Sequence, residues 1–410
     1  MPRLLVRPIL FVLLLVVLTG SSRADITLIG VATLPGNMAD LSGLKENASD
    51  GTPQNRLGGL SGMAYTGRGH EYLHIADRGP KDGASDYVCR FHRMEMRVSP
   101  GVTPALTLKL IGTTLLTDEQ GRRYIGALEA FDNQSLEASR RLDPEGVVVG
   151  RDGTIYISDE YGPVIYEFDT RGQRQRSLPL PARFRPRKWS KSPAEELPPH
   201  NTTGRQPNRG MEGLAISPDG TKLYGIMQSP LIQDGGVNAT GKRTGLNCRL
   251  LEVEIRTGKT REFVYPLDHA SHGLNEILAV NDQEFLVIER DGKPGKTAGF
   301  KKIMLINITG ATDVSGVESL PAEALPKTIV PVKKKTFLNL LDERFKIVGD
   351  DCPEKFEGLV FGPDLPDGRH LLFVTADNDF IAEQPLRVYA FAIDKTDLPG
   401  YQPQQFAPRR

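Results

Sequence analysis

One segment pattern recurs five times along the chain, and this repetition restricts the fold more than any other feature of the sequence. Each copy combines a small or acidic residue, an apolar run, a turn, a second apolar run and a polar cluster. The copies begin at Gly58, Glu145, Glu212, Asn275 and Glu357. The fourth copy is the weakest match. Turns such as Asp152-Gly153, between β-rich runs, are hairpin signals, so the chain is predicted to repeat a β-hairpin unit.

Further β-rich runs follow most of the hairpins. A third run is found at residues 164–169, 249–255, 303–308 and 386–393, and a fourth at 105–111, 173–180 and 260–265. Four antiparallel strands per unit, with long insertions between units, are typical of a β-propeller. We therefore expect an all-β propeller in which five blades are recognisable. A sixth blade remains an alternative within residues 112–144 or 181–209, although the proline-rich, basic composition of the second segment favours an irregular loop.

The two ends of the chain predict how the ring closes. The last unit has only three strands, and Ile26–Leu34 is a spare strand that can complete its sheet. This gives a closing strand and loop at residues 25–56, a propeller at 57–394 and a Pro/Gln-rich tail at 395–410. Joining the termini in one sheet removes an open edge from the ring. Residues 337–345 are expected to form one short helix.

The first 24 residues have the pattern of a cleavable signal peptide. Arg3 and Arg7 precede an apolar run at residues 9–18, and Ser22 and Ala24 are the small residues that a signal peptidase reads. An apolar run of this length is too short to span a bilayer. The sequence therefore predicts cleavage near Ala24, a secreted or periplasmic protein, and no stable membrane anchor.

Charge, cysteines and motifs exclude several functions. The chain carries 51 basic and 51 acidic residues, so nothing indicates a nucleic-acid-binding surface. Three cysteines allow one disulfide at most. We expect the cysteines to be small buried side chains, and the sequence does not decide whether two of them form a disulfide. No G-x-S-x-G, H-E-x-x-H or Walker A motif is found in the sequence. Any hydrolysis by this chain would therefore be metal-assisted. We also expect the protein to be a monomer.

Hairpin geometry is expected to bring the polar clusters of different units together. The second strand of a hairpin returns to the level at which the first strand began. In a propeller these hairpins are innermost, so their polar groups converge on one mouth of the central channel. The expected neighbours are Glu145 with Asp159 and Glu160, Glu212 with Gln228, Glu276 with Glu289 and Asp291, and Glu357 with Asp377 and Asp379, with Asp77 and Arg78 at the matching place in the first unit.

Carboxylates gathered in one concavity repel one another unless a cation neutralises them. A hard divalent cation bound by oxygen ligands, with Ca²⁺ the first choice, is the common solution. The metal-ligand candidates are Glu145, Asp159, Glu212, Glu289, Glu357 and Asp377. The catalytic candidates are Glu145, Asp159, Glu160 and His272. The alternative for each acid is a solvated carboxylate that caps a turn, and for the histidine a structural role.

Basic residues lie next to the acidic positions in the sequence, and we expect them to bind the substrate. Arg78, Arg209 and Arg290 are the candidates for binding an anionic substrate. A guanidinium group offers planar, bidentate donors to phosphate or carboxylate. The alternative for each arginine is an ion pair that holds a neighbouring acid.

Four segments carry a resemblance to a known family. They read DPEGVVVGRDGTIYISDEYGPVIYEFD from Asp143, NRGMEGLAISPDGTKLY from Asn208, GGLSGMAY and FEGLVF. They resemble the phytase-like family, also described as having esterase-like activity of phytase, and the resemblance extends over roughly residues 57–394. It implies an exported β-propeller with a calcium-dependent phosphoesterase or esterase role on a small anionic or ester substrate.

Two other functions stay open at this point. A propeller can bind a ligand or a protein in the cell envelope without catalysis, because fold alone does not decide function. A lactonase-like hydrolase with a single metal site is the other alternative.

Overall fold

The computed structural model describes residues 26–408 apart from 133–134, 136–137 and 179. The predicted signal peptide, residues 1–24, lies outside the described part of the chain. Within that part, no helix combines the length and apolarity needed to cross a membrane.

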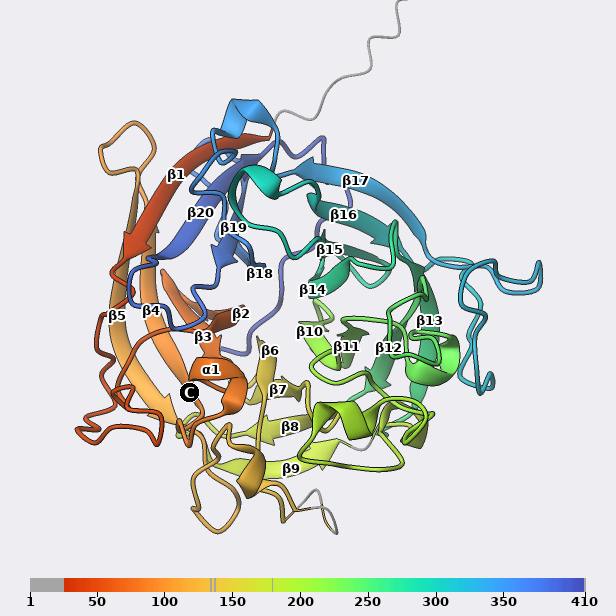
Figure 1. The fold of residues 1–410 in the computed structure, drawn as a ribbon. Helices are drawn as coiled ribbons and strands as arrows, with labels where there is room; N and C mark the ends of the chain where they lie inside the picture. The colour runs from red at the N-terminus through yellow and green to blue at the C-terminus, as the bar shows by residue number, and fades with distance from the viewer. Residues whose placement is uncertain (1–25, 133–134, 136–137, 179, 409–410) are drawn as a thin grey trace, which may run out of the picture.

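Five four-stranded antiparallel sheets form a ring, as the sequence predicts (Figure 1). Blade 1 contains β2 (Leu60–Arg68), β3 (Glu71–Ala76), β4 (Arg90–Val98) and β5 (Leu106–Leu115). Blade 2 contains β6 (Pro144–Val149), β7 (Ile155–Asp159), β8 (Val164–Phe168) and β9 (Arg174–Leu178). Blade 3 contains β10 (Met211–Ile216), β11 (Lys222–Met227), β12 (Asn247–Glu254) and β13 (Thr260–Pro266).

Blade 4 contains β14 (Gly273–Ala279), β15 (Glu284–Arg290), β16 (Lys301–Asn307) and β17 (Lys333–Asn339). Blade 5 contains β18 (Phe356–Gly362), β19 (His370–Ala376), β20 (Leu386–Ile393) and β1 (Thr27–Leu34). The helical segments are α1 (Pro80–Gly83), η1 (Leu128–Ala130), η2 (Ala182–Phe184), η3 (Pro193–Glu196), η4 (Ile232–Asp234), η5 (Gly295–Thr297) and η6 (Glu343–Phe345). All of them are short.

The closing strand is confirmed. β1 pairs antiparallel with β20, from Thr27 opposite Ala392 to Leu34 opposite Leu386. Apart from the end of β5 and the first residue of β6, the described residues of the two segments proposed for a sixth blade contain only short 3₁₀ helices and isolated bridges. The ring therefore has five blades.

Two sequence expectations are corrected. The helix expected at residues 337–345 is wrong, because β17 occupies the first part and the turn η6 the last. Leu338 pairs with Ile303 and is buried against the blade 4 and blade 5 core. The three cysteines are all free and buried, so the disulfide left open does not form.

The apolar core is divided among the interfaces between blades. One cluster lies between each pair of neighbouring blades, for example Ile288 of β15 with Leu359 of β18 between blades 4 and 5. Successive side chains of a strand point to opposite faces of its sheet, so each sheet buries apolar side chains on both faces, against the two neighbouring blades. The central channel is therefore lined by the innermost strand of each blade, namely β2, β6, β10, β14 and β18.

Every inner hairpin has a register shift at the same place. The shifts lie between Leu60 and Gly62, Pro144 and Val147, Met211 and Gly213, Leu274 and Glu276, and Phe356 and Leu359. A β-bulge bends its strand and re-aims a side chain. All five inner strands thus depart from regular pairing near the same end of the central channel.

Glycine accompanies the bulge in four of the five blades. A Cβ at Gly146 would stand 2.5 Å from the Leu214 backbone nitrogen, and a Cβ at Gly213 would stand 2.7 Å from the Cα of Glu276. At Gly146 and Gly213 the inner strands of neighbouring blades therefore approach too closely for a side chain.

Gly146→Ala is expected to lower the free energy of unfolding by about 1–3 kcal/mol, because the added methyl group would clash with the backbone of Leu214 in the next blade. Urea denaturation of the mature protein measures this loss. Gly316→Ala is the matched control, because a Cβ there meets no atom within 4 Å; it should change the free energy of unfolding by less than about 1 kcal/mol. Equal effects of the two substitutions would contradict the close approach.

Two histidines are buried side by side in blade 1. His74 and His92 are opposite residues on β3 and β4, and both are fully buried. His92 Nδ1 lies 3.0 Å from Thr113 Oγ1, whereas neither ring nitrogen of His74 has a hydrogen-bond partner in the described part of the chain. The pKa of each imidazole is lowered to about 3, mainly by burial, and in His74 the neighbouring His92 contributes to the shift.

This pair predicts acid sensitivity. The unfolded chain binds a proton on each histidine near the ordinary pKa of 6.5, whereas the native protein does so only near 3. Stability is therefore complete above pH 6.5 and falls as the pH drops toward 3, by up to about 1.4 kcal/mol per pH unit for each histidine.

His74→Leu should make the thermal midpoint less dependent on pH in this interval. His70→Leu, at the exposed turn between β2 and β3, should leave the dependence as in the wild type. An unchanged acid sensitivity in His74→Leu would contradict the assignment.

Candidate functional site

Five side chains, one from each inner strand, line a cavity of about 120 Å³ at one mouth of the channel. They occupy equivalent positions beside the bulges and are Ser61, Glu145, Glu212, Asn275 and Glu357. We call these five residues the mouth ring. The bulge explains why they face the axis, because it re-aims the side chain at that position.

Members of the mouth ring in neighbouring blades contact one another. Asn275 Nδ2 donates to Glu212 Oε1 at 2.8 Å, and Gln228 Nε2 donates to the same oxygen at 2.6 Å. Ser61 Oγ donates to Glu357 Oε2 at 3.4 Å. Asn275 Nδ2 also lies 3.5 Å from Glu357 Oε1, so side chains from blades 1, 3, 4 and 5 belong to one polar network. The expected pairing of Glu212 with Gln228 is confirmed.

The fourth blade departs from the expected alignment by one residue. Asn275 occupies the mouth-ring position, and Glu276 stands where the other blades have glycine. Glu276 Oε1 accepts hydrogen bonds from the backbone nitrogens of Leu214 at 3.1 Å and Ile277 at 3.0 Å. This carboxyl group joins blades 3 and 4, and it does not line the mouth.

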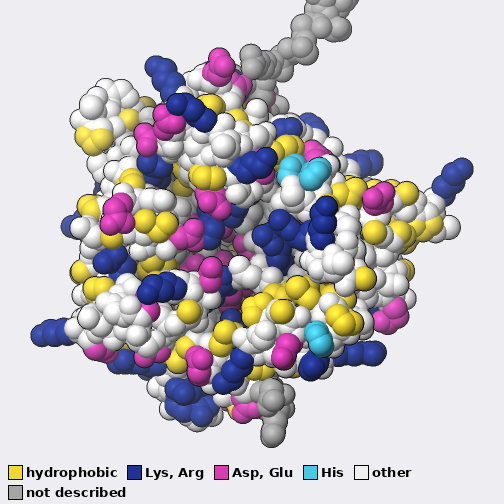
Figure 2. Space-filling model, viewed as in Figure 1, with side chains coloured by type: hydrophobic (Ala, Val, Ile, Leu, Met, Phe, Trp, Pro, Cys, Tyr) yellow, Lys and Arg dark blue, Asp and Glu magenta, His cyan; other side chains and the backbone are white. Residues whose placement is uncertain are grey.

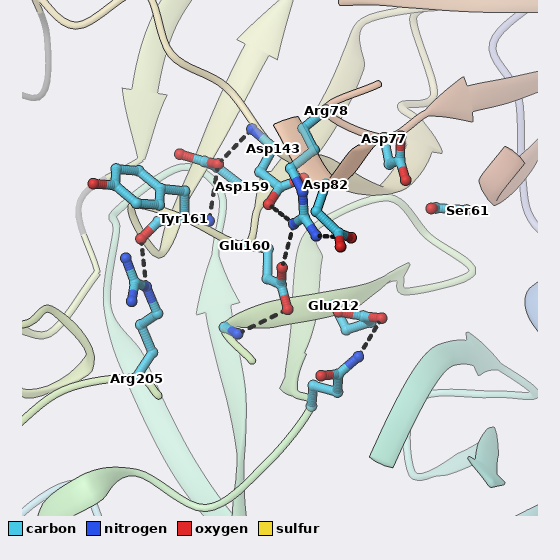
Figure 3. A network of polar contacts seen from close by, with 12 residues as sticks. Ser61, Asp77, Arg78, Asp82, Asp143, Asp159, Glu160, Tyr161, Arg205 and Glu212 are labelled. Atoms are coloured by element: carbon cyan, nitrogen blue, oxygen red, sulfur yellow. Dashed lines mark hydrogen bonds and ion pairs between the residues drawn. The ribbon is translucent and has the colours of Figure 1, made fainter. Parts of the chain in front are cut away.

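Two buried acids, Asp143 and Glu160, contact Arg78 beside the mouth ring (Figure 3). Arg78 Nη1 lies 2.5 Å from Asp143 Oδ2 and 3.3 Å from Glu160 Oε2. Asp143, Glu145 and Glu160 each offer an oxygen within 4.8 Å of the others. Arg78 follows β3, Asp143 precedes β6 and Glu160 follows β7, so the group sits between blades 1 and 2. We call these three carboxylates the acid triad.

A second acidic group lies toward blade 5. Asp77, Asp377 and Asp379 also have oxygens within 4.8 Å of one another. Lys355 forms an ion pair with Asp379, and its Nζ lies 3.9 Å from Asp377 Oδ2. Burial and the nearby Glu357 carboxylate raise the pKa of Asp377 to about 7.

Burial and mutual repulsion dominate the electrostatics of the mouth. Burial raises the pKa of Glu145 well above its usual range, and the neighbouring Glu212 carboxylate raises it further. Glu212 is affected in the same way by burial and then by Glu160. Asp143 Oδ1 and Glu212 Oε2 are buried and have no hydrogen-bond partner among the described residues. Such oxygens can accept a proton or a hard cation.

Arginines gather on the opposite side of the same cavity. Arg209, Arg243 and Arg290 line it from blades 3 and 4, and Figure 2 shows basic side chains beside the acidic hollow at the centre of this face. Arg290 Nη2 lies 2.7 Å from Glu357 Oε1. The Arg209 side chain makes no hydrogen bond or ion pair within the described residues, and burial followed by the nearby Arg243 lowers its pKa to about 10. One side of the mouth therefore attracts a cation and the other an anion.

Most of the predicted site residues line this cavity. Those that do are Glu145, Glu160, Glu212, Glu357, Arg78, Arg209 and Arg290. Asp159 lies behind the mouth, where its Oδ1 accepts from the backbone nitrogens of Asp143 at 2.9 Å and Tyr161 at 3.1 Å. Its Oδ2 accepts from Gly162 N at 3.1 Å. This is the turn-capping geometry that the sequence left as an alternative, and burial raises the pKa of Asp159 to about 7.

Glu289 and His272 form a separate group outside the cavity lining. His272 Nδ1 lies 3.0 Å from Glu289 Oε1, and Glu289 Oε2 lies 2.9 Å from Lys334 Nζ and accepts from Tyr265 Oη at 2.8 Å. Burial alone would raise the pKa of Glu289, but the His272 hydrogen bond and the Lys334 charge lower it to about 2. Glu289 is already saturated by these donors, and the structure does not bring it to the other predicted ligands.

Sequence reasoning did not single out several residues of the mouth. Asp143 belongs to the acid triad, Asn275 to the mouth ring and Lys355 to the second acidic group. A signal for Asp143 was present, because it precedes the Pro-Glu-Gly step directly. Lys355 had a matching signal, two residues before the fifth Glu-Gly step.

Comparison with known proteins places the chain in a family. The family model described as "Phytase-like: Esterase-like activity of phytase" matches residues 55–380. An uncharacterized secreted protein of Arthroderma benhamiae is 30% identical over 343 residues, which cover 67% of this chain and 64% of that protein. The chain thus spans less than two thirds of that relative.

Solved structures give weaker likenesses. The calcium-binding protein regucalcin of Agrobacterium tumefaciens is 10% identical, with 93% of this chain and 99% of that chain covered and a TM-score of 0.37. A gluconolactonase of Xanthomonas campestris is 11% identical, with 88% and 97% covered and a TM-score of 0.33. We draw no functional conclusion from likenesses of this size.

The raised pKa values predict that single neutral substitutions stabilise the metal-free protein. A carboxyl group whose native pKa lies above its unfolded value favours folding below the unfolded pKa, and that contribution is lost as the pH rises. Glu145→Gln should therefore raise the thermal midpoint in the presence of chelator, and more at pH 8 than at pH 4.5.

Asp159→Asn is the matched control for this measurement. An amide cannot accept all three backbone hydrogen bonds, so its midpoint should fall, with a loss of about 1 kcal/mol or more. A fall of similar size in Glu145→Gln at both pH values would contradict repulsion in the mouth.

Proposed function

The chain belongs to the phytase-like family, and we propose that it is an exported, calcium-dependent hydrolase of phosphate or carboxylic esters. The observation that carries the proposal is one cavity with buried carboxylates on one side and arginines on the other. An ester with an anionic group can meet both sides at once.

The acid triad is the part of the mouth that best fits a cation. Asp143, Glu145 and Glu160 are buried, their oxygens lie within 4.8 Å of one another, and Asp143 Oδ1 lacks a hydrogen-bond partner within the described residues. A donor set made only of oxygen suits Ca²⁺ better than zinc, which prefers nitrogen and sulfur. A bound divalent cation would polarise the ester oxygen and lower the pKa of a water molecule.

Two arginines of the mouth have binding roles in this proposal, and one member of the acid triad also has a proton-transfer role. Arg209 and Arg290 hold the anionic group of the substrate, since a guanidinium group offers paired donors to phosphate or carboxylate. Glu160 accepts the proton of the attacking water. Burial raises the pKa of Glu160, which makes its carboxylate a stronger base.

Export is part of the same proposal. The Arthroderma benhamiae relative is described as secreted, and the first 24 residues of this chain have a signal-peptide pattern. We propose that the mature protein acts outside the cytoplasm, where calcium is commonly more available to weak sites of this kind.

A non-catalytic ligand-binding propeller is the second candidate. The ion pairs of Arg78 with Asp143 and Glu160, and of Arg290 with Glu357, already neutralise much of the mouth. A mouth neutralised in this way favours binding of a polar ligand without a resident metal. Turnover separates the two candidates.

The first test is metal-dependent turnover and stability. The mature protein should hydrolyse at least one of p-nitrophenyl phosphate, p-nitrophenyl acetate and a simple lactone, and EDTA should abolish the reaction. Calcium at a hundredfold excess over its dissociation constant should stabilise the native state by about 2.7 kcal/mol.

Glu145→Gln should lose both effects of calcium, because it removes a ligand of the acid triad. Asp159→Asn should keep the calcium-induced stabilisation, because that carboxylate caps a turn. Absence of chelator-sensitive turnover on all three substrates would remove the catalytic proposal and leave the binding propeller.

The second test concerns the arginine side of the mouth. Arg209→Gln should raise the KM for p-nitrophenyl phosphate by about tenfold or more, because a charge-assisted contact is worth roughly 1.5–3 kcal/mol. The KM for neutral p-nitrophenyl acetate should change little. Arg187→Gln, an exposed arginine on the 181–209 insertion, is the matched control. Equal loss on both substrates in Arg209→Gln would contradict an anion-binding role.

A further inference from the structure

A second and larger cavity lies on the same channel, next to its other mouth. Its volume is about 630 Å³, and it shares no lining residue with the polar mouth. Its walls come from the inner strands two to four residues beyond the mouth ring, and include Met63, Val148, Leu214, Ile277 and Leu359. All five blades therefore contribute an apolar side chain. We call this space the apolar chamber.

The C-terminal tail crosses the open end of this chamber. We call residues 398–407 the strap. Backbone nitrogens of Gln402, Gln405 and Ala407 donate to carbonyls of Val280, Pro218 and Arg151, each at 2.8 Å. These three carbonyls lie just after the inner strands of blades 4, 3 and 2, so the strap passes over successive blades. Figure 1 shows the violet end of the chain crossing the ring.

Aromatic contacts hold the two ends of the strap. The Tyr401 ring packs against Phe361 of blade 5, with ring centroids 4.3 Å apart. The Phe406 ring packs edge-on against Tyr65 of blade 1 at 5.7 Å, and Gly67 leaves the space for it, since a Cβ there would lie 2.5 Å from that ring. Together with the backbone bonds, these contacts tie the strap to all five blades.

Charged groups are confined to one edge of the chamber. Asp364 lies 2.8 Å from His370 Nδ1 and 3.2 Å from Lys395 Nζ, and the Lys395 side chain is largely exposed. These groups neutralise one another. An ionic ligand would therefore find no unpaired counter-charge among them, whereas an apolar ligand would find walls from every blade.

We propose that the apolar chamber is a binding site for an uncharged, largely apolar small molecule, and that the strap is its lid. The volume falls within the usual range of ligand cavities, which is about 300–1,000 Å³. Burial of an apolar molecule against these walls is favourable because it removes apolar surface from water. The site does not depend on the acid triad or on any metal.

Fluorescence titration of the mature protein with N-phenylnaphthylamine, an uncharged apolar probe, tests the proposal. One saturable site is expected. Ala279→Trp and Pro403→Trp each place a large side chain on the chamber lining, one from blade 4 and one from the strap. Each should weaken probe binding by about tenfold or more, since the filled space no longer admits the probe.

Two controls separate this site from the mouth. Glu212→Gln should leave probe binding unchanged, and both tryptophan variants should keep the wild-type response of the thermal midpoint to calcium. Pro403→Trp lies on the strap and leaves the blade interfaces intact, so it remains informative if Ala279→Trp does not fold. No saturable binding, or binding unaffected by Pro403→Trp, would overturn the proposal.

Discussion

Close packing of five inner strands is the constraint on which the rest of the structure depends. Where these strands meet near the mouth, glycine replaces a side chain in four blades, and a Cβ at Gly146 or Gly213 would touch the backbone of the next blade. The neighbouring bulges turn the mouth-ring side chains into the small space that remains. Carboxylates such as Glu145 and Glu212 are thereby buried close together, so the free energy of ionising them is raised by the packing itself.

The same strands build two cavities with opposite chemistry. Along each inner strand the bulge position carries a polar side chain and a position two to four residues later carries an apolar one, as with Glu212 and Leu214 or Glu357 and Leu359. The polar residues meet at one mouth and the apolar residues at the other. A single short repeat, used five times, is therefore enough to give the channel a charged end and an apolar end.

Much of the fold could be predicted from the sequence because the repeats are local. The hairpin turns, the five units and the closing strand each depend on a few adjacent residues. Strand β4 and strand β17 were not recognised: β17 carries the Lys333–Lys335 charge run and follows a long insertion, so its pairing with β16 depends on distant residues.

The site could be predicted only in part, because the repeated sequence pattern does not determine which side chain at a bulge points into the channel. Glu145, Glu212 and Glu357 follow the repeat and reach the mouth. In the fourth unit the sequence Asn275-Glu276 places the amide in the mouth and the carboxylate between blades. Asp159 and Glu160 are adjacent, yet one caps a turn and the other faces the cavity. Which one faces inward is decided by the strand alternation and the turn that follows.

Calorimetric titration of calcium into the mature protein at pH 7, in two buffers with different ionisation enthalpies, tests the central claim most directly. If packing keeps protons on the buried acids until a cation replaces them, binding must release protons. The apparent binding enthalpy will then differ between the buffers, with a fraction of a proton or more released per calcium bound, and Glu145→Gln will reduce the release. Identical enthalpies in the two buffers, or no binding heat in either, would contradict the account.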